Sequence, residues 1–214
     1  DGDALVLPTA KLLKILQALR DTFPKLQRVS SYAAPKDILR KSEDELRQLK
    51  EAGLQLLYYG METGDDATLK AVNKGVNGEE AVEAGRRVTA SGMKLSIMVI
   101  LGLAGKEGSY RHAIETAKAI NIIQPTMWSA LCLMLYRGSE LLEQFERGEF
   151  NPLSPAELME ELYIMMENVN LPADKHCLFR SNHISNYIPL AGTLPKDKQK
   201  LLAEIKYSAQ ELSK

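Results

Sequence analysis

Cysteine is scarce in this sequence, since only Cys132 and Cys177 occur among its 214 residues. The two lie in separate segments, which excludes a disulfide-rich scaffold and argues against a metal site built from cysteine alone. We therefore expect both side chains to be free, mostly buried thiols.

An excess of charge of one sign is also missing, because 27 Lys and Arg residues stand against 28 Asp and Glu residues. The formal net charge of −1 creates no general attraction to nucleic acid or to an anionic membrane. Neither is expected as a default partner.

Long apolar runs are absent as well. The longest, at residues 95–104 and 128–136, are much shorter than the roughly 20 residues that cross a bilayer. The first residues show no basic segment or apolar core of an export signal. We expect a cytoplasmic location.

What the sequence does contain is a regular alternation of two hydrophobic patterns. Compact apolar runs predict strands at 27–32, 54–59, 93–101 and 126–135. Helical spacing and capping residues predict helices at 9–23, 42–53, 65–73, 78–91 and 109–122. Buried strands separated by helices require a parallel sheet, either open or closed into a barrel. The fold class is therefore predicted to be α/β.

The pattern changes after residue 138. Helices are predicted at 139–147, 154–168 and 195–212, with Pro- and Asn-containing connections at 149–153 and 170–194. We expect residues 148–214 to form a helical C-terminal extension that packs on the sheet.

In α/β sheets and barrels, the loops that follow the strands form the functional site. Such loops are predicted at 1–3, 31–33, 60–65 and 102–105. Glu62 stands out because it lies shortly after a buried strand, in a segment bounded by two glycines, and a carboxylate can accept hydrogen bonds from two neighbouring hydroxyls. A solvated loop carboxylate is the alternative interpretation.

Several short motifs then match one family in order and spacing. They are Asp-Gly-Asp-Ala-Leu at 1–5, Ser-Tyr-Ala at 31–33, Gly-Leu-Gln-Leu-Leu-Tyr-Tyr-Gly-Met-Glu-Thr-Gly at 53–64, Leu-Lys-Ala-Val-Asn-Lys-Gly at 69–75, Ile-Leu-Gly-Leu at 100–103 and Arg-Gly-Ser-Glu-Leu at 137–141. In this order the sequence resembles radical S-adenosylmethionine (SAM) enzymes. The segments 179–187 and 192–198 are similar to the tail of a subgroup often described as Fe-S oxidoreductases.

The resemblance implies a partial (β/α)6 TIM-like barrel that binds SAM against a [4Fe-4S] cluster. Such an oxidoreductase takes an electron from an external donor, cleaves SAM reductively and releases a 5′-deoxyadenosyl radical. The resemblance also implies the cofactor-binding residues. Asp1, Gly2 and Asp3 would contact the methionine amino group of SAM, and Lys74 would pair with its carboxylate. Glu62, with Thr63, would bind the ribose, and the backbone around Leu101 and Gly102 would contact the adenine. Ser31 and Tyr32 are further candidates at a strand end.

One departure from the family decides what the chain can do. The three-cysteine loop that holds the cluster, Cys-x3-Cys-x2-Cys, is absent, and neither Cys132 nor Cys177 can replace it. We therefore expect this chain to be the portion downstream of the cluster loop, with residues 1–147 forming the third to sixth barrel strands and their helices. We expect it to bind no cluster by itself and to self-associate through the barrel edge exposed by the truncation.

The substrate is not readable beyond its polarity. Arg180, Asn182 and His183 are candidates for substrate contacts, although most histidines in such a setting are ordinary loop residues bonded to the backbone. His112 is expected to pack or cap a helix. Two alternatives remain open: a cluster-free barrel that binds a nucleotide-like ligand or a protein, and an unrelated TIM-barrel enzyme of phosphate or sugar chemistry.

Overall fold

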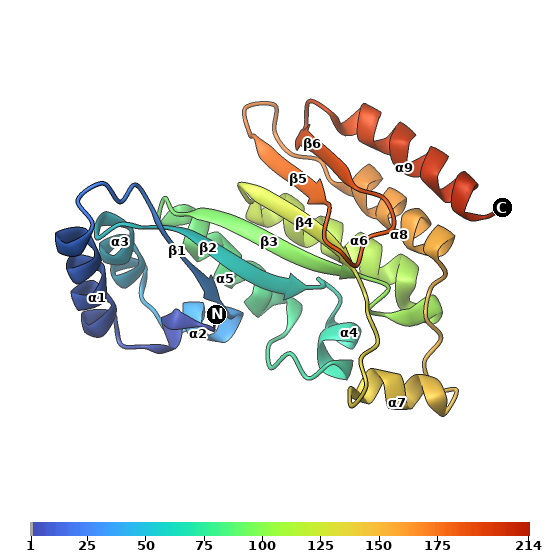
Figure 1. The fold of residues 1–214 in the computed structure, drawn as a ribbon, viewed down its shortest axis with the longest axis horizontal. Coiled ribbons are helices and arrows are strands. Elements are labelled where there is room, and N and C mark those ends of the chain that lie inside the picture. Colours follow the sequence, from blue (N-terminus) through green and yellow to red (C-terminus); the bar gives the residue numbers. More distant parts are fainter. Residues whose placement is uncertain (1) are drawn as a thin grey trace.

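The computed structural model describes residues 2–214 and contains a six-stranded sheet in the order β1-β2-β3-β4-β5-β6 (Figure 1). The strands are β1 (Val29–Ala33), β2 (Leu54–Glu62), β3 (Lys94–Leu101), β4 (Met127–Cys132), β5 (Cys177–Ser181) and β6 (Leu190–Leu194). Neighbours from β1 to β5 pair in parallel, and only β5 and β6 are antiparallel. The predicted α/β class is confirmed.

Helices precede, connect and follow the strands. They are α1 (Thr9–Thr22), α2 (Pro35–Leu39), α3 (Glu43–Glu51), α4 (Asp66–Ala71), α5 (Gly78–Ala90), α6 (Gly105–Ile123), α7 (Glu140–Glu146), α8 (Pro155–Asn168) and α9 (Lys198–Leu212), with a 3-10 turn η1 (Ala4–Val6) before them. Capping boxes begin α3, α5 and α8, where Ser42, Asn77 and Ser154 each exchange hydrogen bonds with a glutamate three residues later. These local signals in the sequence mark where the three helices begin.

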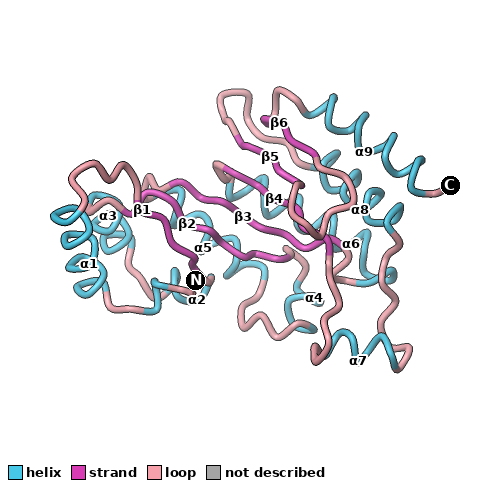
Figure 2. Tube along the Cα trace, in the orientation of Figure 1, coloured by secondary structure: helices cyan, strands magenta, loops and turns pink. Residues whose placement is uncertain are grey.

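The core lies between the sheet and the helices on one of its faces (Figure 2). Alternate strand residues such as Tyr59, Ile97 and Trp128 are fully buried there. On the opposite face Tyr32 lies beside Tyr58, with ring centroids 5.5 Å apart, and Tyr32 is 48% exposed. Among the described residues, no helix has both the length and the apolar character that a membrane crossing requires.

The C-terminal region differs from the expected helical extension. Residues 170–194, predicted to be a connection, contain β5 and β6, and β5 pairs with β4 so that the sheet continues. Both strands have five residues, and part of β5 faces outward through Leu178. Short strands of this kind lack the continuous apolar run that identified β2 and β3.

Candidate functional site

A hollow of about 450 Å³ lies over the carboxyl-terminal parts of β1 and β2. Its lining comes from the residues before η1, the first three strands, the residue after β1 and the α4–α5 connection. It consists of Gly2, Asp3, Tyr32, Ala33, Ala34, Tyr58, Gly60, Glu62, Lys74 and Met98. Six residues of the predicted loops therefore meet in one place, as expected where parallel strands end.

Glu62 ends β2 in an unusual conformation. Its φ of 65° is in the left-handed region, and the pairing register with β3 shifts between Gly60 and Glu62. The Glu62 side chain lies across Gly60, because a Cβ added to Gly60 would overlap Glu62 Oε1. A glycine is thus required at position 60 by the position of the carboxylate.

Lys74 completes this arrangement from the α4–α5 connection. Its Nζ donates to Glu62 Oε1 at 2.9 Å, and both side chains keep about a quarter of their surface exposed, 22% for Lys74 and 23% for Glu62. One carboxylate oxygen and two ammonium hydrogens are left without a partner within the pair. The pair therefore offers a ligand one acceptor and two donors.

The N-terminal candidates have other contacts. Asp1 is outside the described residues. Asp3 accepts from the backbone N–H of Leu5 at 2.8 Å and of Ala34 at 2.6 Å, so its carboxylate already joins η1 to the end of β1. Burial raises the pKa of Asp3, and the neighbouring Asp37 acts in the same direction. Ser31 donates to the Tyr32 carbonyl and is not among the lining residues.

Thr63 and Leu101 are not among the residues that line the hollow. Thr63 is fully buried, with Oγ1 2.7 Å from His112 Nδ1, and Leu101 is a fully buried core residue. Gly102 follows at the end of β3, but its backbone N–H donates to Glu161 Oε1 at 2.7 Å. The sequence placed these residues near the site, and the structure places them behind it.

Glu161 is the residue that the sequence analysis missed. It lies on α8 with 1% of its surface exposed. Its carboxylate accepts one hydrogen bond from the Gly102 N–H and another from the Ser109 hydroxyl, the latter at 2.6 Å. Burial raises its pKa to about 7. The available signal was an acidic residue among the apolar positions of α8, next to Leu158 and Leu162.

The three substrate candidates lie at a different part of the sheet. Arg180 is on β5, paired with Ser129 of β4, so β3 and β4 separate it from β2. His183 lies in the β5–β6 loop, where its Nδ1 is 2.9 Å from Ser185 Oγ, and the same hydroxyl accepts from Cys132 N–H at 3.2 Å. Asn182 shares this exposed loop. They do not line the hollow around Glu62.

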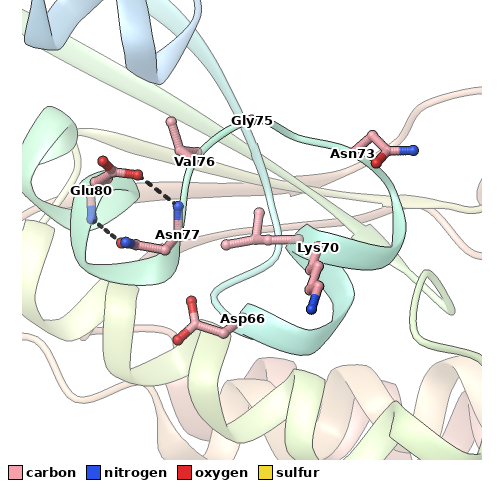
Figure 3. A pocket seen from close by; sticks show the side chains of 8 residues that line it. Asp66, Lys70, Asn73, Gly75, Val76, Asn77 and Glu80 are labelled. Atoms are coloured by element: carbon pink, nitrogen blue, oxygen red, sulfur yellow. Dashed lines mark hydrogen bonds between the residues drawn. The ribbon is translucent and has the colours of Figure 1, made fainter.

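A second hollow, of about 560 Å³, lies on the α4–α5 connection (Figure 3). Figure 3 shows that Asn77 and Glu80 bond to each other there, in the capping box of α5. Asp66 likewise accepts from the backbone N–H of Gly78 at 2.6 Å. Several polar groups of this larger hollow thus serve the local fold, and the Glu62 hollow is the better candidate site.

The iron–sulfur cluster that the resemblance implies does not fit the residues that the structure describes. Within residues 2–214 no three His, Cys, Asp or Glu side chains gather in a way that could hold a metal ion. Cys132 and Cys177 are both buried, and burial raises the pKa of their thiols to about 11 and about 12. Neither thiol readily loses its proton to become the thiolate that binds a metal.

Comparisons with known proteins identify proteins that this chain is similar to. The chain is 28% identical over 164 residues to an uncharacterised protein of Methanocaldococcus jannaschii, covering 76% of this chain and 45% of that protein. It is 25% identical over 171 residues to the tRNA uridine(34) acetyltransferase of Methanocaldococcus infernus, covering 79% of this chain and 31% of that protein. The chain thus spans less than half the length of each relative.

Solved structures show the same fold. Elp3 of Methanocaldococcus infernus, with an N-terminal deletion, superimposes with a TM-score of 0.65 at 19% identity, covering 100% of this chain and 53% of that chain. HydG, a maturase of the [FeFe]-hydrogenase, gives a TM-score of 0.53 at 14% identity, covering 78% and 38%. The expected partial barrel is confirmed. Residues 1–118 match the family model of the radical SAM superfamily, and the chain belongs to that superfamily.

Proposed function

We propose that this chain forms the SAM-binding part of a radical SAM oxidoreductase. The observation that carries the proposal is the Glu62–Lys74 pair, whose side chains are about a quarter exposed in the hollow at the ends of β1 and β2. SAM, when bound against a [4Fe-4S] cluster and reduced by an external electron donor, supplies a 5′-deoxyadenosyl radical.

The residues of the pair have complementary tasks. The free oxygen of Glu62 would accept from a ribose hydroxyl, and a charged acceptor makes that hydrogen bond stronger than a neutral one. The two free hydrogens of Lys74 would hold the methionine carboxylate of SAM. The Tyr32 and Tyr58 rings supply an apolar wall beside them. Thr63 has no ligand contact in this proposal.

The cluster ligands would come from outside this chain, because its two cysteines are buried and separate. Anaerobic iron–sulfur reconstitution of the complete protein should give a [4Fe-4S] spectrum, and reduction with SAM should give 5′-deoxyadenosine. If no cluster forms, the alternative function, a cluster-free barrel that binds a nucleotide-like ligand or a protein, would replace this proposal.

For the substrate, we propose a polar molecule that contacts Arg180, Asn182 and His183. Two curated relatives have the name tRNA uridine(34) acetyltransferase, whereas oxidoreductase is our proposal from the resemblance to the Fe-S oxidoreductase subgroup. Products formed by the complete protein would distinguish these reaction types.

Replacing Glu62 with glutamine tests the site. The Glu62→Gln side chain keeps one acceptor oxygen but loses the charge, so the dissociation constant for SAM should rise about tenfold or more. The measurement is calorimetric titration of SAM into the complete, cluster-loaded protein.

Glu79→Gln is a matched control, since it removes one exposed carboxylate from the first turn of α5, outside the hollow. It should bind SAM like the unmodified protein, and both variants should melt at nearly the same temperature. Equal SAM affinity of Glu62→Gln and the unmodified protein would remove Glu62 from the site.

A further inference from the structure

A buried polar network lies behind the loops that follow β2 and β3. It combines Thr63 at the end of β2, Gly102 at the end of β3, His112 of α6 and Glu161 of α8. The side chains of His112 and Glu161 are both 0% exposed. None of these four residues lines the hollow, so the network has no direct contact with a ligand there.

On the β2 side, the network holds the residue that follows Glu62. Thr63 Oγ1 lies 2.7 Å from His112 Nδ1 and accepts from the Asp65 N–H at 2.9 Å. Because Oγ1 already accepts from Asp65, its own proton is free to be donated to His112. The next N–H, of Gly64, donates to Thr116 Oγ1 at 2.9 Å.

These contacts stabilise an unfavourable backbone conformation of Glu62. A glutamate with φ of 65° is in a region that side chains other than glycine rarely adopt, and such residues persist only where the surroundings hold them. The fixed Thr63 and Gly64 are the surroundings on the C-terminal side of Glu62.

On the β3 side, Glu161 accepts from Gly102 N–H at 2.7 Å and from Ser109 Oγ–H at 2.6 Å. Gly102 itself has φ of 80°. The carboxylate of the C-terminal region thus fixes the turn between β3 and α6.

The two sides meet at His112. With Nδ1 accepting from Thr63, the ring proton is on Nε2, which lies 3.6 Å from Glu161 Oε1 and has no partner within hydrogen-bond geometry. Burial lowers the pKa of His112 to about 4, against the opposing charge of Asp65, so the ring is neutral. A neutral ring can accept through Nδ1, which is compatible with a hydrogen bond donated by the Thr63 hydroxyl.

We propose that His112 and Glu161 are positioning residues, which fix the ends of β2 and β3 and so hold Glu62 in the orientation that binds SAM. This inference rests on the proposed function of Glu62. It assigns to the C-terminal region a part in SAM binding although that region does not line the hollow.

Two pairs of near-isosteric variants test the inference in the complete, cluster-loaded protein. Thr63→Val and Glu161→Leu remove the side-chain hydrogen bonds. Thr63→Ser keeps the hydroxyl, and Glu161→Gln keeps an acceptor for the Gly102 N–H, while its amide NH2 can donate to Ser109 Oγ. The first two should raise the dissociation constant for SAM at least about tenfold, and the second two should stay within about threefold of the unmodified protein. Without SAM, hydrogen exchange in residues 60–65 and 101–104 should be faster only in the first two.

Met166→Ala controls for loss of stability, because Met166 is fully buried on α8 and has no part in the network. It should leave SAM affinity unchanged. Near-normal SAM affinity in Thr63→Val and Glu161→Leu would overturn the inference, and so would an equal loss in Met166→Ala or in Glu161→Gln. Normal affinity in Glu62→Gln would instead reject the proposed function, so the two failures are distinguishable.

Discussion

Replacing Gly64 with alanine should lower the free energy of unfolding by about 3 kcal/mol or more, because α6 passes too close to admit a side chain. An added Cβ would lie 2.5 Å from the Glu115 carbonyl oxygen and 2.9 Å from Thr116 Cα, both backbone atoms of α6. Separating β2 from α6 would also break the hydrogen bond from Gly64 N–H to Thr116. Urea unfolding followed by the fluorescence of Trp128, the single and fully buried tryptophan, measures the effect.

Gly60→Ala is the matched control within the same motif. The nearest atom to its added Cβ belongs to the end of the Glu62 side chain, which can rotate away. We expect the free energy of unfolding to change by less than about 1 kcal/mol, while SAM binding weakens because Glu62 is displaced. Equal stability of Gly64→Ala and Gly60→Ala would contradict the close approach of α6 that the structure shows.

Replacing Glu161 with glutamine should stabilise the protein increasingly as the pH rises. The pKa of Glu161 is about 7 in the folded state against an ordinary 4.5, so the folded state holds its proton more tightly than the unfolded state does. The stability from this raised pKa is fully present below pH 4.5 and is lost as the pH rises through 7. A shift of this size corresponds to about 3 kcal/mol. Glutamine has no such loss and keeps the acceptor for Gly102.

His112 masks this behaviour in the unmodified protein. Its pKa is about 4 when folded against an ordinary 6.5, so its contribution to stability rises with pH between those values and offsets that of Glu161. Asp65 and Cys132 are the other titratable groups near the pair. The stability difference between Glu161→Gln and the unmodified protein should therefore grow from near zero at pH 4 to about 3 kcal/mol at pH 8. Parallel stability curves for the two proteins across this range would show that Glu161 does not titrate there.

The central strands could be predicted because burial on one or both faces leaves a continuous apolar pattern. β2, β3 and β4 were each identified from such a run, and the capping box at Ser42 marked the start of α3. α2 has five residues, too few for a helical repeat of apolar residues to be recognised in the sequence. α6 begins at Gly105, four residues before its predicted start at 109. Tertiary contacts decide such short or glycine-rich segments.

For the site, the family resemblance assigned Glu62 to the ribose and Lys74 to the carboxylate of one SAM molecule, and the structure places the two side chains 2.9 Å apart. It also predicted that His112 would pack, and His112 is fully buried. The partners of the network could not be predicted, because no local pattern relates Gly102 to Glu161 across 59 residues. The strand-end rule located Thr63 and Leu101 at the ends of their strands, but it does not say which side chains face a hollow, and these two are buried and outside the lining.

The hydrogen bond between Gly102 and Glu161 also has a consequence for synthesis. Because translation adds roughly 5–20 residues per second, the β3 end emerges roughly 3–12 s before the carboxylate that binds it 59 residues later. The nascent barrel can form its central strands in that interval, but the Gly102 N–H and Ser109 hydroxyl stay with water until α8 arrives. The strand ends behind the Glu62 hollow are therefore completed late, and a ribosome that stops before α8 leaves a sheet whose candidate cofactor site is unfinished.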